Sequence, residues 1–116
     1  MQTVGKSEKY LTLDNKRRML VVKYEDIEYV KSNGRKIVIV TQTDEYEVYG
    51  KMYDITEKLA SANHLFCRCH KGYIVNFNHI AEFGRKYIIL KSGKEIPVGK
   101  FYLEDTKQNF FHFLEM

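Results

Sequence analysis

Short runs in which apolar and polar residues alternate fill most of this chain, and this period of two is typical of half-buried β-strands. In the first half the runs are Tyr10–Leu13, Arg17–Val22, Ile27–Ser32, Lys36–Thr41 and Glu45–Tyr49. Asn33-Gly34-Arg35 lies between two of them and is a hairpin signal, because Asn and Gly tolerate positive φ. Asp14-Asn15 and Gln42-Thr43-Asp44 supply further turns, so this half predicts a meander of antiparallel strands.

The apolar spacing becomes helical between Lys51 and about Ala62. The stripe consists of Met52, Ile55, Leu59 and Ala62. Such a stripe is typical of a helix that packs against a sheet, which is the arrangement we expect here.

Strand patterns resume after this helix. They are Leu65–Cys69, Ile74–Val75, Ile80–Phe83, Tyr87–Lys91 and Glu95–Val98. Pro97 has no N–H to donate, so we expect its strand at a sheet edge. The closing segment, Phe101–Phe113, is expected to be partly helical, with its aromatic residues sealing one end of the core. The pattern therefore predicts a mainly β fold with antiparallel strands, one central short helix and a C-terminal segment that is partly helical.

The composition is that of one folded domain, with 116 residues of which 44% are hydrophobic and 14% aromatic. We expect residues 1–9 to form a flexible N-terminal stub and residues 10–116 to form the domain. No apolar run approaches the ~20 residues of a membrane span, so no membrane partner is expected. Cys67 and Cys69 are two residues apart on one strand, which is poor geometry for a disulfide. We therefore expect reduced thiols in a cytoplasmic protein.

Basic residues are concentrated in the third quarter of the chain. Residues 66–100 contain seven Lys or Arg and two Asp or Glu, whereas residues 1–65 are almost balanced, with eleven against ten. A localised cationic surface is typical of a polyanion binder. A solvated basic face without a partner would have the same composition.

Other chemistries have little support in the sequence. Cys69 and His70 are neighbours on a predicted strand, so they point to opposite faces and cannot form a local nucleophile–base pair. The Cys-x-Cys pair lacks the second ligand pair of a structural zinc site, and no glycine-rich phosphate loop is present. We expect no enzyme activity, no metal and no cofactor. A redox role for Cys69 would need an accessible thiol of low pKa.

Three predicted turns each place a glycine beside a long cation. They are Asn33-Gly34-Arg35-Lys36, His70-Lys71-Gly72 and Gly99-Lys100. A single exposed cation at a turn is commonplace, but three such turns together with the charge concentration favour nucleic-acid binding. Arg and Lys can read guanine edges, while Lys, Arg, Asn and Tyr can contact phosphates.

The segment Phe66–Ile80, FCRCHKGYIVNFNHI, resembles the core signature of the LytTR domain, the DNA-binding module of LytR/AlgR-type bacterial response regulators. Ile96–Tyr102 resembles a second element of that family, and the resemblance extends over about residues 10–112. It implies an elongated stack of small antiparallel β-sheets whose loops enter successive major grooves of double-stranded DNA. Gly72 and Gly99 stand where the family usually has Ser, so the phosphate contacts of those hydroxyls are not implied here, although backbone N–H groups could substitute for them.

The resemblance also implies roles for individual residues. The base-contacting residues would be Arg35, Lys71 and Lys100. The residues that contact the DNA backbone or support the loops would be Lys36, Arg68, His70, Tyr73, Asn76, Asn78 and Gly99. The implied partners are tandem DNA half-sites, a second copy of the chain on DNA, and an upstream receiver or sensory domain.

Two alternatives remain open from the sequence. One is a basic β-rich module that binds an acidic protein. The other is a single-stranded nucleic-acid binder that uses Tyr73 and Phe77 as stacking platforms.

Overall fold

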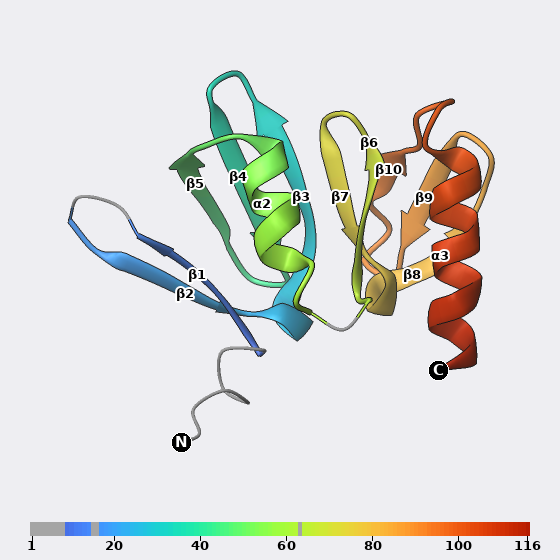
Figure 1. Cartoon of the computed structure of the whole chain (residues 1–116), viewed down its shortest axis with the longest axis horizontal. Helices are drawn as coiled ribbons and strands as arrows, with labels where there is room; N and C mark the ends of the chain where they lie inside the picture. The colour runs from blue at the N-terminus through green and yellow to red at the C-terminus, as the bar shows by residue number, and fades with distance from the viewer. Residues whose placement is uncertain (1–8, 15–16, 63) are drawn as a thin grey trace.

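The computed structural model describes residues 9–14, 17–62 and 64–116, and these fold into three antiparallel sheets and two α-helices. The sheets lie side by side along the longest dimension of the molecule, which measures 40 × 35 × 25 Å (Figure 1). The mainly β class, the small antiparallel sheets and both helices are confirmed. The expected stub at residues 1–9 lies outside the described residues except for Lys9, whose carbonyl accepts the Tyr24 N–H at 2.9 Å.

The first sheet is the predicted opening hairpin. Strand β1 (Tyr10–Asp14) pairs with β2 (Met19–Lys23), with Leu11 opposite Val22. Leu11, Leu13 and Val22 are buried, as their alternation predicts. The tip of this hairpin at residues 15–16 lies outside the described residues. A 3-10 turn, η1 (Tyr24–Asp26), then leads into the central sheet.

The central sheet has the strand order β5-β4-β3-β7-β6. Its strands are β3 (Ile27–Asn33), β4 (Lys36–Thr41), β5 (Glu45–Tyr49), β6 (Phe66–His70) and β7 (Tyr73–Asn76). The β3–β4 hairpin closes with two residues, and the first of them, Gly34, has φ 65°. A glycine of positive φ at this position is typical of a type II′ turn, so only the glycine needs the left-handed conformation.

Both faces of the central sheet are buried. Ile37 and Ile39 of β4 point into one core, which includes Ile55 and Leu59 of helix α2 (Met52–Leu59). Val38 and Val40 point into a second core on the other face. The helix stripe thus packs on the sheet as predicted, although α2 ends at Leu59 and Ala62 is buried in the turn that follows.

The third sheet and the C-terminal helix close the second core. The strands β8 (Ile80–Phe83), β9 (Tyr87–Leu90) and β10 (Glu95–Pro97) follow a short 3-10 turn, η2 (Phe77–His79). Strand β10 is at the edge of this sheet, which confirms the placement of Pro97.

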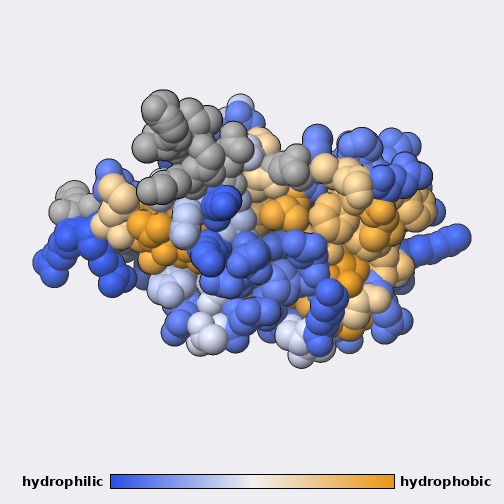
Figure 2. Space-filling view, turned by 90° about the horizontal axis from the view of Figure 1, so that it is seen from below, coloured by the Kyte–Doolittle hydropathy of each residue, from blue (hydrophilic) through white to orange (hydrophobic). Residues whose placement is uncertain are grey.

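Helix α3 (Leu103–Glu115) buries only part of its aromatic content. The rings of Phe110 and Phe113 lie 5.3 and 5.6 Å from that of Phe77. Phe111, expected in the same seal, points outward and is 54% exposed. Figure 2 views the molecule from below, and apolar surface is visible there on the right, the side on which α3 ends.

Candidate nucleic-acid interface

Three cation-bearing turns lie along one edge of the molecule, at the top of Figure 1. They are the β3–β4 turn (Gly34-Arg35), the β6–β7 turn (Lys71-Gly72) and the turn between β10 and α3 (Gly99–Tyr102). We call these residues the three-turn edge. The Ser32 N–H donates to the Gly72 carbonyl at 3.0 Å, and the Gly99 N–H donates to the Cys69 carbonyl at 2.8 Å. The second turn is therefore hydrogen-bonded to the neighbourhood of both others.

In the first turn the Arg35 side chain is exposed, whereas the Lys36 side chain contacts residues of the neighbouring strand β5. The Lys36 Nζ lies 3.6 Å from a Glu47 carboxylate oxygen and 5.4 Å from the centre of the Tyr49 ring. Ion pairs this exposed contribute little free energy. Lys36 can therefore exchange Glu47 for another anion at low cost, whereas Arg35 projects from the turn itself.

The second turn is braced by two of the predicted support residues. A guanidinium nitrogen of Arg68, Nη2, donates to the Lys71 carbonyl at 2.6 Å. The Gly72 N–H donates to Nδ1 of His70 at 3.0 Å, and the His70 ring packs edge-on against Tyr73 at 5.5 Å. Arg68, His70 and Tyr73 thus act within the protein, and the exposed Lys71 side chain is the part of this turn that faces solvent.

The third turn is fixed to the second by close packing at a glycine. The Tyr102 N–H donates to the Gly99 carbonyl at 2.9 Å and closes the turn. A Cβ at Gly99 would lie 3.0 Å from the Tyr102 ring and 3.6 Å from His70. Lys100 and Phe101 occupy the two central positions and are exposed.

The two glycines that stand in place of Ser do not offer N–H groups to a ligand. The Gly72 N–H is used by His70 and the Gly99 N–H by Cys69. In this structure the two N–H groups are therefore not free to substitute for the Ser hydroxyls. A Cβ at Gly72 would lie 3.1 Å from the Ser32 hydroxyl oxygen, so Gly72 lets the end of β3 approach the second turn, whereas Gly99 makes room for the Tyr102 ring of its own turn.

Asn76 and Asn78 lie at the other end of β7 from Lys71. Asn76 is fully buried, and its Nδ2 donates to the carbonyls of Tyr24 and Ile27 at 3.1 and 2.8 Å. Its Oδ1 accepts the Asn78 N–H at 2.9 Å. Asn76 therefore supports η1 and η2, not the three-turn edge, and its burial leaves no atom for DNA.

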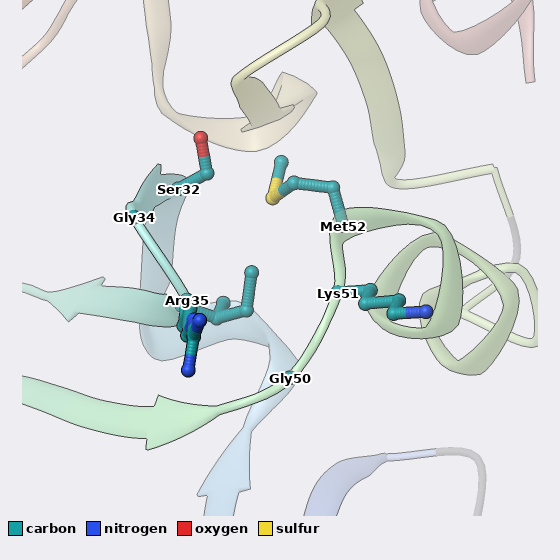
Figure 3. A pocket seen from close by; sticks show the side chains of 7 residues that line it. Ser32, Gly34, Arg35, Gly50, Lys51 and Met52 are labelled. Carbon is teal, nitrogen blue, oxygen red and sulfur yellow. The ribbon is translucent and has the colours of Figure 1, made fainter.

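A pocket of about 590 Å³ opens beside the first turn (Figure 3). Its lining residues are Ser32, Gly34, Arg35, Ile37, Gly50, Lys51 and Met52. The Met52 side chain reaches toward Ser32 across the opening, while the Lys51 side chain points away from Arg35. The two cations do not converge, so the pocket is not an anion cradle.

The thiols lack the properties that redox or nucleophilic chemistry needs. Burial raises the pKa of Cys69 to about 12 and also raises the pKa of Cys67. Both cysteines are free. In residues 9–14, 17–62 and 64–116, no three His, Cys, Asp or Glu side chains are grouped to hold a metal ion. Neither helix of these ranges is long and apolar enough to cross a membrane.

The proposed stacking platforms for a single strand are not available. Phe77 is buried at 3% exposure. The Tyr73 ring is half-buried between Tyr29 and His70, at 6.3 and 5.5 Å. Neither ring presents a free face for a base.

Two features of this edge were missed from the sequence. The turn at Gly84–Lys86 lies beside the third turn, because the Lys86 carbonyl accepts the Val98 N–H at 2.8 Å. Its signal was the adjacent pair of cations Arg85-Lys86, in a segment where Gly84-Arg85 predicted only a turn. The second feature is Phe101, to which the sequence analysis assigned no role of its own.

Comparison with known proteins gives the family. The family described as the LytTr DNA-binding domain matches residues 17–110. The sensory transduction protein LytT of Bacillus anthracis is 31% identical over 103 residues, which are 84% of this chain and 41% of that protein. The transcriptional regulatory protein BtsR of Escherichia coli K12 is 23% identical over 105 residues, covering 86% of this chain and 42% of that protein.

A solved LytTr DNA-binding domain from Bacillus cereus has the same fold, with a TM-score of 0.74 at 19% identity, over 87% of this chain and 95% of that one. The chain spans about two fifths of the length of the curated relatives named above. On the match over residues 17–110, this chain belongs to the LytTR family of DNA-binding domains.

Proposed function

We propose that this chain binds double-stranded DNA sequence-specifically, as the DNA-binding part of a bacterial transcription regulator. The observation that carries the proposal is the row of three turns on one edge, each with an exposed cation: Arg35, Lys71 and Lys100. The row runs along the 40 Å axis of the molecule. In the proposal these turns enter successive major grooves on one side of a duplex, where one turn of B-DNA is about 34 Å long.

The reading residues would be Arg35, Lys71 and Lys100. Arg and Lys donate to guanine O6 and N7 in the major groove. Lys100 is a point charge and not a planar fork, so it would discriminate less sharply than Arg35. The brace from Arg68 to the Lys71 carbonyl fixes the second turn before binding, which reduces the ordering cost of the complex.

Contacts to the DNA backbone would come from cations beside the reading turns. Lys36 can exchange its exposed partner Glu47 for a phosphate. Arg85 and Lys86 are exposed next to the third turn. Such contacts position the protein without reading sequence, so the affinity should fall steeply as salt rises.

The wider setting is proposed on the same basis. The chain would act on tandem half-sites, as two copies on one duplex, and within a longer cytoplasmic regulator that includes a receiver or sensory domain. The curated relatives are more than twice as long as the part this chain matches.

The test begins by selecting the preferred duplex from a random pool. A repeated motif should be enriched, and single-stranded DNA of the same sequence should bind more weakly. On the selected duplex, Lys71→Ala should lose about 1–3 kcal/mol of binding free energy and relax the preference at one base pair. Lys58→Ala, an exposed lysine on α2, is the matched control and should bind as the unsubstituted protein does. If no motif is enriched, or Lys71→Ala matches Lys58→Ala, the proposal fails.

A further inference from the structure

Phe101 is displayed at the three-turn edge without any packing role. It is 93% exposed, the most exposed large apolar side chain in the described ranges. The core next to it is closed by other rings, since Phe110 and Phe113 pack on Phe77. The Phe101 ring therefore contributes nothing to the fold that would explain an aromatic residue here.

The turn that presents Phe101 is held in place. The Gly99 N–H bonds the Cys69 carbonyl, and the Tyr102 N–H bonds the Gly99 carbonyl, at 2.8 and 2.9 Å. The Tyr102 carbonyl then accepts the Thr106 N–H at 2.9 Å, in the first turn of α3. Phe101 is thus set between two anchored residues, and its exposure is a property of a fixed turn.

Lys100, the neighbour of Phe101 in the chain, indicates which surface of DNA the Phe101 ring would contact. Lys100 and Phe101 are the two central residues of one turn and are both exposed, so consecutive residues present a cation and an aromatic ring. The major groove presents a matching pair of features: guanine O6 and N7 accept hydrogen bonds, and the thymine C5-methyl group is apolar. A stacking contact would require the bases to be unstacked first, at a cost of a few kcal/mol per step.

We propose that Phe101 is a specificity-determining residue that packs on the C5-methyl group of a thymine, next to the base pair contacted by Lys100. The inference rests on the proposed function and adds an apolar contact to its three cationic ones. It gives the preferred site a thymine within one or two base pairs of the guanine read by Lys100.

The test uses the duplex selected from the random pool, at fixed salt. Each thymine near the position that Lys100→Ala relaxes is replaced by deoxyuridine, which lacks only the methyl group. Affinities are measured for the unsubstituted protein, Phe101→Ala and Phe111→Ala. Phe111 is an exposed phenylalanine on α3 and is the matched control.

The expected result is a double-mutant cycle with coupling at one thymine. Deoxyuridine there should weaken the unsubstituted protein about fourfold, the factor that corresponds to one apolar group of methylene size. Phe101→Ala should weaken binding roughly tenfold on the thymine duplex and show no further loss on the deoxyuridine duplex. Phe111→Ala should retain the affinity and the response to deoxyuridine of the unsubstituted protein.

Two results would overturn the inference while the proposed function stands. In one, Phe101→Ala binds the selected duplex as tightly as the unsubstituted protein. In the other, its loss is the same on thymine and deoxyuridine duplexes, as a wedge or a contact between protein copies would give. A chain that selects no duplex overturns both proposals.

Discussion

Asn76 is the position at which we expect a substitution to lower the stability of the fold without changing the affinity for DNA. Asn76→Ala removes three hydrogen bonds from a fully buried position: two from Nδ2 to the carbonyls of Tyr24 and Ile27, and one to Oδ1 from the Asn78 N–H. Each is worth about 1 kcal/mol net, and a buried group left without a partner adds about 1–3 kcal/mol. We expect a loss of about 3–5 kcal/mol in the free energy of unfolding.

That loss is large against the total of about 5–15 kcal/mol for a domain. Urea unfolding followed by circular dichroism or tyrosine fluorescence measures it, and the chain has nine Tyr and no Trp. Asn78→Ala is the control, because Asn78 is exposed and contributes its backbone N–H to the cluster, not its side chain. It should change stability by less than about 0.5 kcal/mol.

Unlike its stability, the affinity of Asn76→Ala for DNA should not change. At a temperature where Asn76→Ala remains folded, its affinity for the selected duplex should equal that of the unsubstituted protein, because Asn76 lies at the far end of β7 from Lys71. A variant that keeps full stability, or one that stays folded and loses specific affinity, would refute the reasoning.

Three further outcomes follow from contacts elsewhere in the chain. Arg68→Met should lower specific affinity about tenfold, because it removes the hydrogen bond from Nη2 that holds the Lys71 carbonyl. Arg68→Lys keeps a donor and the charge and should recover part of this loss; titration of the duplex measures both, and an unchanged affinity in Arg68→Met would contradict the role of the brace. Burial raises the pKa of Cys69 from 9.0 to about 12. Between these values the folded chain retains a proton that the unfolded chain releases, so the free energy of unfolding should fall as the pH rises from about 9 toward 12. Urea unfolding at several pH values should show a smaller fall for Cys69→Ala. Gly84→Ala should lower the free energy of unfolding by about 1–3 kcal/mol, because its Cβ would lie 2.9 Å from the Tyr87 carbonyl oxygen. At Gly50 the nearest atom would be 3.7 Å away, so Gly50→Ala should leave the stability measured by urea unfolding unchanged.

The local pattern of apolar, polar and turn residues was sufficient to predict the strands and helices of this fold. The strand runs around Gly34 and the helical stripe from Met52 to Leu59 appear where period and turn chemistry place them. These signals need only neighbours in sequence, because a hairpin turn and a helix face are formed by residues a few positions apart. The match to the family signature at Phe66–Ile80 is likewise a property of contiguous residues.

The packing of the sheets on one another decided which side chains of these elements are buried. Strand β4 has four consecutive apolar residues, Ile37 to Val40, and all four are buried. Such a run is consistent with a strand covered on both faces, but it does not say which elements cover each face. The second face is covered by β8–β10 and α3, which come much later in the chain. For the same reason the sequence could not separate the partly buried Phe110 and Phe113 from the exposed Phe111.

The sequence by itself determined the strands, the two helices, the cation beside each turn glycine and the family of this chain. Only the tertiary structure decided that the three turns share one edge and that Asn76 belongs to the core. The physical reason is that β3 pairs with β7 and that Gly99 bonds to Cys69. These contacts join residues about 30 to 45 positions apart, where no local periodicity reports on geometry.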